Sequence, residues 1–167
     1  VKKLSNWALE QYVDIIMIQE TRATGGNLAS MQSLAMRKGW HGSWQPAKET
    51  NKYGRSGGLA TLIRKPILLN KGVAQYDHRW LKVTIPWTRK TKMHLYNVYG
   101  FDSCQEDAER KKNTELHEQI QEDIMKIGRC PWIAGRDWNL EPDEVQMTWE
   151  VGGKSGRTNL PTQDFGK

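Results

Sequence analysis

With 167 residues, of which 37% are hydrophobic and 26% are charged, the chain is long enough for one domain with a sizeable core, and its composition suits a soluble globular protein. No apolar run approaches the roughly 18 residues that a membrane-spanning helix needs, so the sequence excludes that class of membrane protein. The 25 lysine and arginine residues outnumber the 19 aspartate and glutamate residues, and the pI near 9.3 fits a polyanionic partner such as nucleic acid and, equally, an ordinary basic domain.

The first forty residues predict two helices on either side of one strand. Residues 4–11 follow helical spacing, and the run Ile15–Ile18 is apolar at successive positions, which is typical of a strand covered on both faces. Glu20 lies just beyond the abrupt end of this strand. A turn at residues 25–27 offers a helix cap, and the second helix ends at Gly39.

Between residues 40 and 99 the helical periodicity disappears, and we expect four or more strands there. The clearest is at residues 79–85, where apolar and polar side chains alternate, and residues 93–99 are its expected partner. This middle region also has a basic bias, which could follow a nucleic-acid backbone or could be an ordinary solvated surface.

The last third begins with the most regular helix pattern of the sequence, at residues 106–127. Its isoleucines and leucine recur at helical spacing, with charged residues between them and a glycine just past the end. Residues 131–134 then predict a short buried strand, and Gly135 is expected to begin a polar loop. From residue 152 onward the composition predicts a loop.

Two apolar strands each end beside a carboxylate. The strand Ile15–Ile18 leads to Glu20, and the strand at residues 131–134 leads to Asp137. Loops beyond strand ends can bring distant residues into one cleft, so these carboxylates could share a site. In an extended segment Asp137 and Asn139 would point the same way, which would place an amide beside the second carboxylate.

This combination suits the hydrolysis of a phosphate ester. Mg²⁺ takes oxygen ligands, usually one or two carboxylates together with water and substrate phosphate oxygens, and Glu20 fits that role. Asp137 could orient or deprotonate an attacking water, and Asn139 could hold Asp137 or a phosphate oxygen. The competing interpretation is that each of these side chains is a solvated turn residue.

Four short segments stand in a distinctive order: QET at residues 19–21, SGGLA at 56–60, YNVYG at 96–100 and GRDWN at 135–139. They resemble the LQET, GGVA, NVYAP and GGDFN segments of the endonuclease/exonuclease/phosphatase superfamily, and their spacing matches as well. The resemblance extends from about residue 4 to residue 162. It is nearest to the endonuclease domains of non-LTR retrotransposons.

The resemblance implies roles at the matching positions only. Glu20 would be a metal ligand, Asp137 and Asn139 would act at the scissile phosphate, and Tyr99 would contact or polarise that phosphate. A segment at residues 159–162 is similar to the family's PT segment. The positions assigned to substrate binding are Asn97, Arg136 and Thr162. The structural alternatives are a half-buried strand aromatic for Tyr99 and a plain loop residue for Thr162.

The chain also departs from the family pattern. Arg136 stands where a glycine commonly precedes the motif aspartate, and there it could add a phosphate contact. The family's first strand, which bears an asparagine, and its closing SDH segment have no counterpart here. None of the four histidines lies in such a context, so no catalytic histidine is nominated. The chain also begins with Val1, and we expect its start to be missing.

We therefore expect an α/β fold in which two packed, mostly antiparallel sheets are flanked by helices. This four-layer α/β sandwich would be incomplete at both termini, with residues 1–167 forming a single partial domain. The two cysteines are too few for a disulfide framework and lack the spacing of a zinc site, which favours a reducing compartment.

The function that the resemblance implies is metal-dependent phosphodiester hydrolysis, most simply by a DNA endonuclease. The cofactor would be Mg²⁺ or Mn²⁺, the partner nucleic acid, with DNA preferred, and the location nuclear or cytoplasmic. Two alternatives stay open: a phosphatase-type relative that acts on a small phosphoester, and a non-catalytic remnant that at most binds nucleic acid. Without the SDH segment, whether this chain is itself an active enzyme also stays open. The sequence indicates no membrane association and identifies no protein partner.

Overall fold

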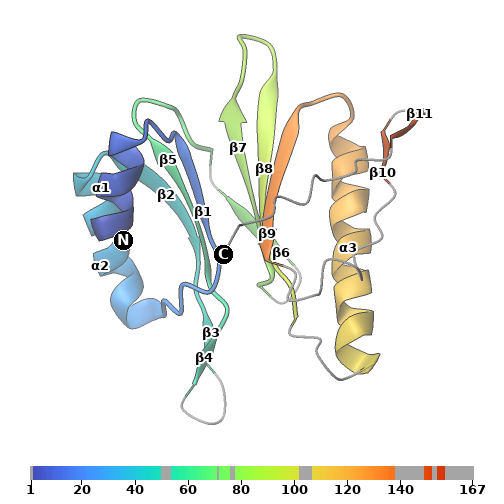
Figure 1. Ribbon diagram of the computed structural model, residues 1–167, viewed down its shortest axis with the longest axis horizontal. Helices are drawn as coiled ribbons and strands as arrows, with labels where there is room; N and C mark the ends of the chain where they lie inside the picture. Colours follow the sequence, from blue (N-terminus) through green and yellow to red (C-terminus); the bar gives the residue numbers. More distant parts are fainter. Residues whose placement is uncertain are drawn as a thin grey trace, which may run out of the picture.

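A computed structural model describes residues 2–49, 54–70, 72–75, 78–101, 107–137, 149–151 and 154–156. In these residues two sheets lie between helices, so that the order of layers is helix, sheet, sheet, helix (Figure 1). Two short ribbons complete the strands: β3 (Lys48–Glu49) pairs with β4 (Arg55–Ser56), and β10 (Trp149–Val151) pairs with β11 (Lys154–Gly156). None of the described helices is long and apolar enough to cross a bilayer.

The first sheet has three antiparallel strands in the order β1 (Ile15–Ile18), β5 (Leu59–Arg64) and β2 (Trp40–Gln45). Helices α1 (Lys2–Glu10) and α2 (Gly25–Arg37) cover its outer face (Figure 1). Thr24 caps α2, and its backbone N–H donates to the Asn27 side chain at 2.9 Å, so one otherwise unpaired amide at the helix start is satisfied.

The second sheet has four strands in the order β6 (Val73–Gln75), β7 (Trp80–Pro86), β8 (Lys92–Tyr99) and β9 (Trp132–Asp137). β7 and β8 form an antiparallel hairpin, whereas β9 runs parallel to β8. A parallel neighbour needs a long connection, and α3 (Asp107–Ile127) lies within that connection and covers the outer face of the sheet (Figure 1).

Alternation along the strands divides their side chains between two apolar layers. On β7, Leu81 and Val83 are buried between the two sheets together with Leu59, Ile63 and Leu95. The residues between them point the other way, toward α3. That outer cluster consists of Trp80, Tyr96, Val98, Leu116 and Ile120. Each large apolar side chain buried in this way contributes about 1.5–3 kcal/mol to folding.

A polar contact also joins α3 to the sheet. Lys82 Nζ lies 2.6 Å from Asp123 Oδ2, and the Tyr96 hydroxyl donates to the same oxygen at 2.7 Å. Burial acts to raise the pKa of Asp123, but the hydrogen bonds from Lys82 and Tyr96 outweigh it, so the pKa lies below its usual value. The carboxylate therefore stays charged and keeps α3 in register with β7 and β8.

The structure confirms the predicted α/β sandwich and corrects three details. The strand before Asp137 does not end at residue 134 but continues through Gly135 to Asp137, because backbone pairing with β8 extends to that point. This strand is also more exposed than predicted, with Ile133 48% exposed. Residues 154–156 form a strand where a loop was predicted.

Candidate active site

Three of the predicted site residues lie at the same end of the two sheets. Glu20 follows β1, Tyr99 ends β8 and Asp137 ends β9. Tyr99 and Asp137 are register partners on neighbouring parallel strands, and the Gly100 N–H donates to the Asp137 carbonyl at 2.7 Å. Side chains of register partners project from the same face of a sheet, so the phenol and the carboxylate are neighbours.

Asn97 joins the two sheets at this end. Its Nδ2 donates to the carbonyl of Ala60 at 2.9 Å and to that of Ile18 at 3.2 Å, while its Oδ1 accepts a bond from Gln19 Nε2 at 2.7 Å. Asn97 is fully buried, so it has no surface with which to touch a substrate. Asn97 therefore fits the role of a positioning residue better than that of the predicted substrate contact. It holds the segment before Glu20 against β8.

The segment that carries Glu20 is held by a glycine turn. The N–H groups of Thr21 and Arg22 donate to the carbonyls of Gly58 and Gly57 at 3.0 and 3.1 Å. Gly58 has φ +86, and a Cβ at this position would lie 2.5 Å from Thr21 Oγ1. Only glycine fits there without displacing the segment, which gives the SGG sequence a structural reason.

Glu20 itself has an uncommon backbone conformation, with φ 51, and its carboxylate is paired with Arg22. The Arg22 guanidinium lies 2.5 Å from Glu20 Oε1, and the side chain of Glu20 is 43% exposed. The hydrogen bond to Glu20 raises the pKa of Arg22, and the charges of Glu20 and Tyr99 add to this effect. Glu20 and Tyr99 therefore both act electrostatically on Arg22.

Arg79 is a site residue that the sequence analysis missed. Its guanidinium lies 5.0 Å from the ring centre of Tyr99 and 4.3 Å from that of Phe101, and it donates to the Gly100 carbonyl at 3.2 Å. A cation over an aromatic face is attractive and fixes the ring. No motif pointed to it, although an arginine at the start of a strand whose partner ends in Tyr99 was a usable signal.

Arg136 projects from the opposite face of its sheet. Its register partner is Val98, which packs against α3, and Arg136 lowers the pKa of the α3 residue His117. Burial is the main cause of that shift and brings the pKa of His117 to about 4, and burial also lowers the pKa of Arg136 to about 9. The Arg136 side chain thus lies beside α3, on the opposite face of the sheet from the side chains of Tyr99 and Asp137. Asn139 and Thr162 lie outside the described residues.

The carboxylates of this end can be set against the ligands that a divalent cation requires. Among the described residues, no group of three histidine, cysteine, aspartate or glutamate side chains could hold a metal ion. Glu20 nevertheless offers a partly exposed carboxylate. Mg²⁺ usually takes only one or two carboxylates and completes its shell with water and substrate phosphate. Within the part of the chain that the structure describes, the donors do not form an all-protein cage, and they fit a divalent cation that takes its other ligands from water and substrate.

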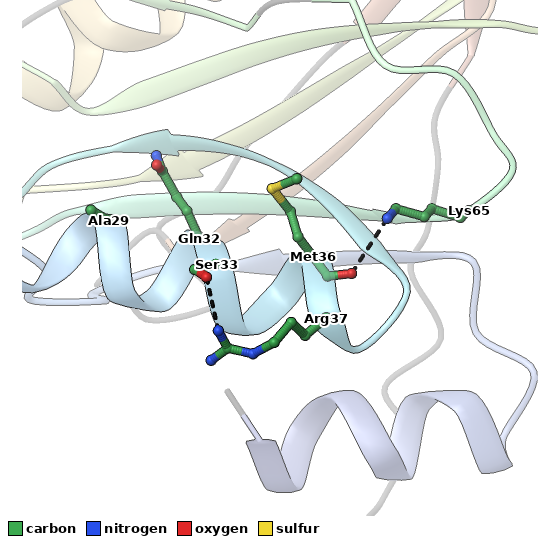
Figure 2. Close-up of a pocket in the computed structure, with 6 residues that line it drawn as sticks. All are labelled: Ala29, Gln32, Ser33, Met36, Arg37 and Lys65. Atoms are coloured by element: carbon green, nitrogen blue, oxygen red, sulfur yellow. Dashed lines mark hydrogen bonds between the residues drawn. The ribbon is translucent and has the colours of Figure 1, made fainter.

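A separate hollow lies on the outer side of α2 (Figure 2). Its lining residues are Ala29, Gln32, Ser33, Met36, Arg37 and Lys65. Arg37 donates to Ser33 Oγ at 3.0 Å and Lys65 to the Met36 carbonyl at 3.4 Å. The lining contains no carboxylate or histidine, and Lys65 follows the end of β5 that is remote from Glu20. The hollow is therefore not part of the candidate site.

Comparisons with known proteins place the fold. A scan against protein-family models found no match to the sequence, and a search of the curated proteins found none either. Among solved structures, the AP endonuclease LMAP from Leishmania major is 13% identical, with a TM-score of 0.60 over 89% of this chain and 52% of that one. ANGEL2, a 2',3'-cyclic phosphatase, is 11% identical, with a TM-score of 0.65 over 84% and 43%.

The endonuclease domain of TRAS1, a telomere-specific non-LTR retrotransposon, is 16% identical, with a TM-score of 0.52 over 85% of this chain and 54% of that one. The chain thus spans about half the length of the solved structures that it matches. Identities this low carry no detail of substrate or mechanism, but the arrangement of layers and strands is shared. The chain therefore shares its α/β sandwich fold with these solved structures.

Proposed function

We propose that this chain is part of a metal-dependent phosphodiester hydrolase that acts on nucleic acid, most simply as a DNA endonuclease. The observation that carries the proposal is the meeting of Glu20, Tyr99 and Asp137 at one end of two facing sheets. Glu20 follows β1, and Tyr99 and Asp137 end β8 and β9, so three separate segments bring two carboxylates and a phenol to this end. Residues 1–167 would form one partial domain of the enzyme, acting in the nucleus or cytoplasm.

Each of these side chains would have a separate role in hydrolysis. Asp137 orients or deprotonates the attacking water, and Tyr99, held by Arg79, donates its phenolic hydrogen to a phosphate oxygen. Glu20 would hold Mg²⁺ or Mn²⁺, which supplies charge stabilisation for a phosphate in the transition state. Asn139 would contact Asp137 or the phosphate, and Thr162 would contact the substrate. Arg136 remains a substrate-binding candidate only if the substrate also reaches the α3 side of β9.

Nucleic acid is preferred to a small phosphoester because of charge. The net charge of +6 favours a polyanion, and two of the structural neighbours are endonucleases by name. ANGEL2, named as a 2',3'-cyclic phosphatase, keeps the phosphatase-type alternative open as a second candidate.

Nicking of supercoiled plasmid with Mg²⁺ tests the proposal. We expect nicking that disappears with EDTA and falls by at least about 100-fold in Asp137→Ala, in the range for removal of a general base. Glu109→Ala removes a carboxylate from α3 and is the matched control. If folded protein leaves the plasmid intact yet hydrolyses a 2',3'-cyclic nucleotide, the phosphatase alternative holds. If it does neither, the result favours the non-catalytic remnant.

A further inference from the structure

A small pocket opens beside the candidate active site, between the β3–β4 ribbon and the start of β7. Its lining residues are Lys48, Ser56, Gly57, Gly58, His78 and Arg79. Lys48 and Ser56 are register partners across the ribbon, so they form one wall together. His78 and Arg79 form another wall, and the two glycines connect the pocket with the Glu20 segment.

The pocket borders directly on the residues assigned to catalysis. A Cβ on Gly57 would lie 3.9 Å from Tyr99 Cδ1, so the glycine turn separates the pocket from the Tyr99 ring by a single van der Waals contact. Arg79 lines the pocket and also packs against Tyr99. A group bound in the pocket would therefore be adjacent to a group bound at Tyr99 and Asp137.

The lining is basic. Lys48 and Arg79 carry cationic side chains, and none of the six lining residues is acidic. The Ser56 hydroxyl supplies a further hydrogen-bond donor. Lysine and arginine beside a hydroxyl are the usual contacts of a nucleic-acid phosphate.

His78 is held in place on one side. Its Nδ1 contacts Nε2 of Gln45, a side chain that is only 7% exposed, and its backbone has φ 63. Because that contact occupies Nδ1, a ligand in the pocket would meet the ring through Nε2. A fixed ring offers its hydrogen bond without a large loss of conformational entropy.

The size of the pocket limits the ligand. Its volume of about 30 Å³ is far below the 300–1,000 Å³ of typical small-molecule sites. A nucleobase or a whole nucleotide does not fit, whereas the oxygens of a single anionic group do. The pocket is therefore a subsite for part of a ligand that extends beyond it.

We propose that this pocket binds the backbone phosphate next to the scissile one. The substrate is then a nucleic-acid strand with at least two neighbouring phosphates, and a small phosphoester would leave the pocket empty. This inference rests on the proposed hydrolase function, because that function places the scissile phosphate beside Tyr99 and Asp137.

The test measures binding in EDTA, so that it does not depend on catalysis. The anisotropy of a short fluorescein-labelled single-stranded DNA gives the affinity at several salt concentrations. We expect Lys48→Ala to bind more weakly and to reduce the slope of log affinity against log salt by about 0.7, the value for one lost phosphate contact on a single strand. Lys48→Arg should restore the slope, which separates a charge contact from a folding defect.

Lys65→Ala is the matched control, because Lys65 is exposed and follows the far end of β5. It should leave the slope unchanged. The proposal is overturned if Lys48→Ala keeps the wild-type slope or if the wild-type chain binds no DNA. It is also overturned if Lys65→Ala reduces the slope as much as Lys48→Ala does. Plasmid nicking with an unchanged slope would reject the subsite and keep the hydrolase. A Lys48-dependent slope without nicking would keep a phosphate contact at this pocket and reject both the hydrolase and the neighbouring scissile phosphate.

Discussion

At the scale of single residues, Arg22 competes with a cation for Glu20. The guanidinium lies 2.5 Å from Oε1, and both side chains are partly exposed, so the pair can separate. We expect Arg22→Gln to bind Mn²⁺ more tightly than the wild-type chain, measured as loss of the free Mn²⁺ signal in electron paramagnetic resonance. Glu20→Gln should lose the binding. Equal affinity in Arg22→Gln and wild type would mean that Arg22 does not compete for this carboxylate.

Asn97 is the residue whose removal should cost most stability at the site. Asn97→Ala leaves the carbonyls of Ile18 and Ala60 without these donors inside the protein, at a cost of about 1–3 kcal/mol for an unsatisfied buried group. Urea denaturation should show this decrease in the free energy of unfolding. Asn70→Ala removes an exposed amide and should stay within about 0.5 kcal/mol of wild type. A similar small change for both would contradict the structural role of Asn97.

At the scale of elements, the glycine turn before β5 controls the Glu20 segment. Gly58→Ala places a Cβ close to Thr21 Oγ1 in a left-handed backbone conformation, so we expect a loss of about 1–3 kcal/mol and weaker Mn²⁺ binding. Gly25→Ala at the start of α2 has no heavy atom within 4 Å of the new Cβ. It should be neutral or slightly stabilising. Thermal unfolding of both variants checks this, and equal melting temperatures would reject the steric argument.

The elements themselves were largely predictable from periodicity. The isoleucine spacing of α3 and the alternation along β7 are local signals, and both elements form close to the predicted positions. The extension of β9 through Gly135 to Asp137 was missed, because pairing with β8 overrides the loop preference of a short polar segment. The same extension places Arg136 on the α3 side, which its motif position did not indicate.

At the scale of the whole molecule, stability should depend on pH through His117. An ordinary histidine takes up its proton near pH 6.5, whereas burial lowers the pKa of His117 to about 4. Between these values the unfolded chain binds more protons than the folded one, so the free energy of unfolding falls as the pH decreases. Stability from this source is complete above pH 6.5 and is lost toward pH 4.

The expected slope is at most about 1.4 kcal/mol per pH unit, the limit for one proton, and partial solvent exposure makes it smaller. Denaturant titrations at several pH values should find a shallower slope in His117→Gln. His41→Gln, which changes a histidine on β2, serves as the comparison. If His117→Gln and the wild-type chain lose stability in parallel, His117 is not the group responsible.

The sequence nominates part of the candidate site, and its geometry comes only from the fold. Glu20 and Asp137 stand just past apolar runs that are visible in the sequence, whereas Tyr99 is nominated by the family resemblance of residues 96–100. The burial of Asn97 and the contact of Arg79 with Tyr99 arise from packing between segments that are distant in the chain. Nothing local to either residue encodes such a contact, so only the folded structure reveals it.

The bonds of Asn97 also decide how the molecule opens. One buried amide joins β1, β5 and β8, so the two sheets cannot part at this end without breaking it. Hydrogen exchange should therefore find the backbone amides of Thr21 and Arg22 in one cooperative unit with that of Gly100, with a common free energy of opening. Two independently fluctuating sheets would give two values. A single free energy of opening would mean that the Glu20 segment and the ends of β8 and β9 unfold and refold together.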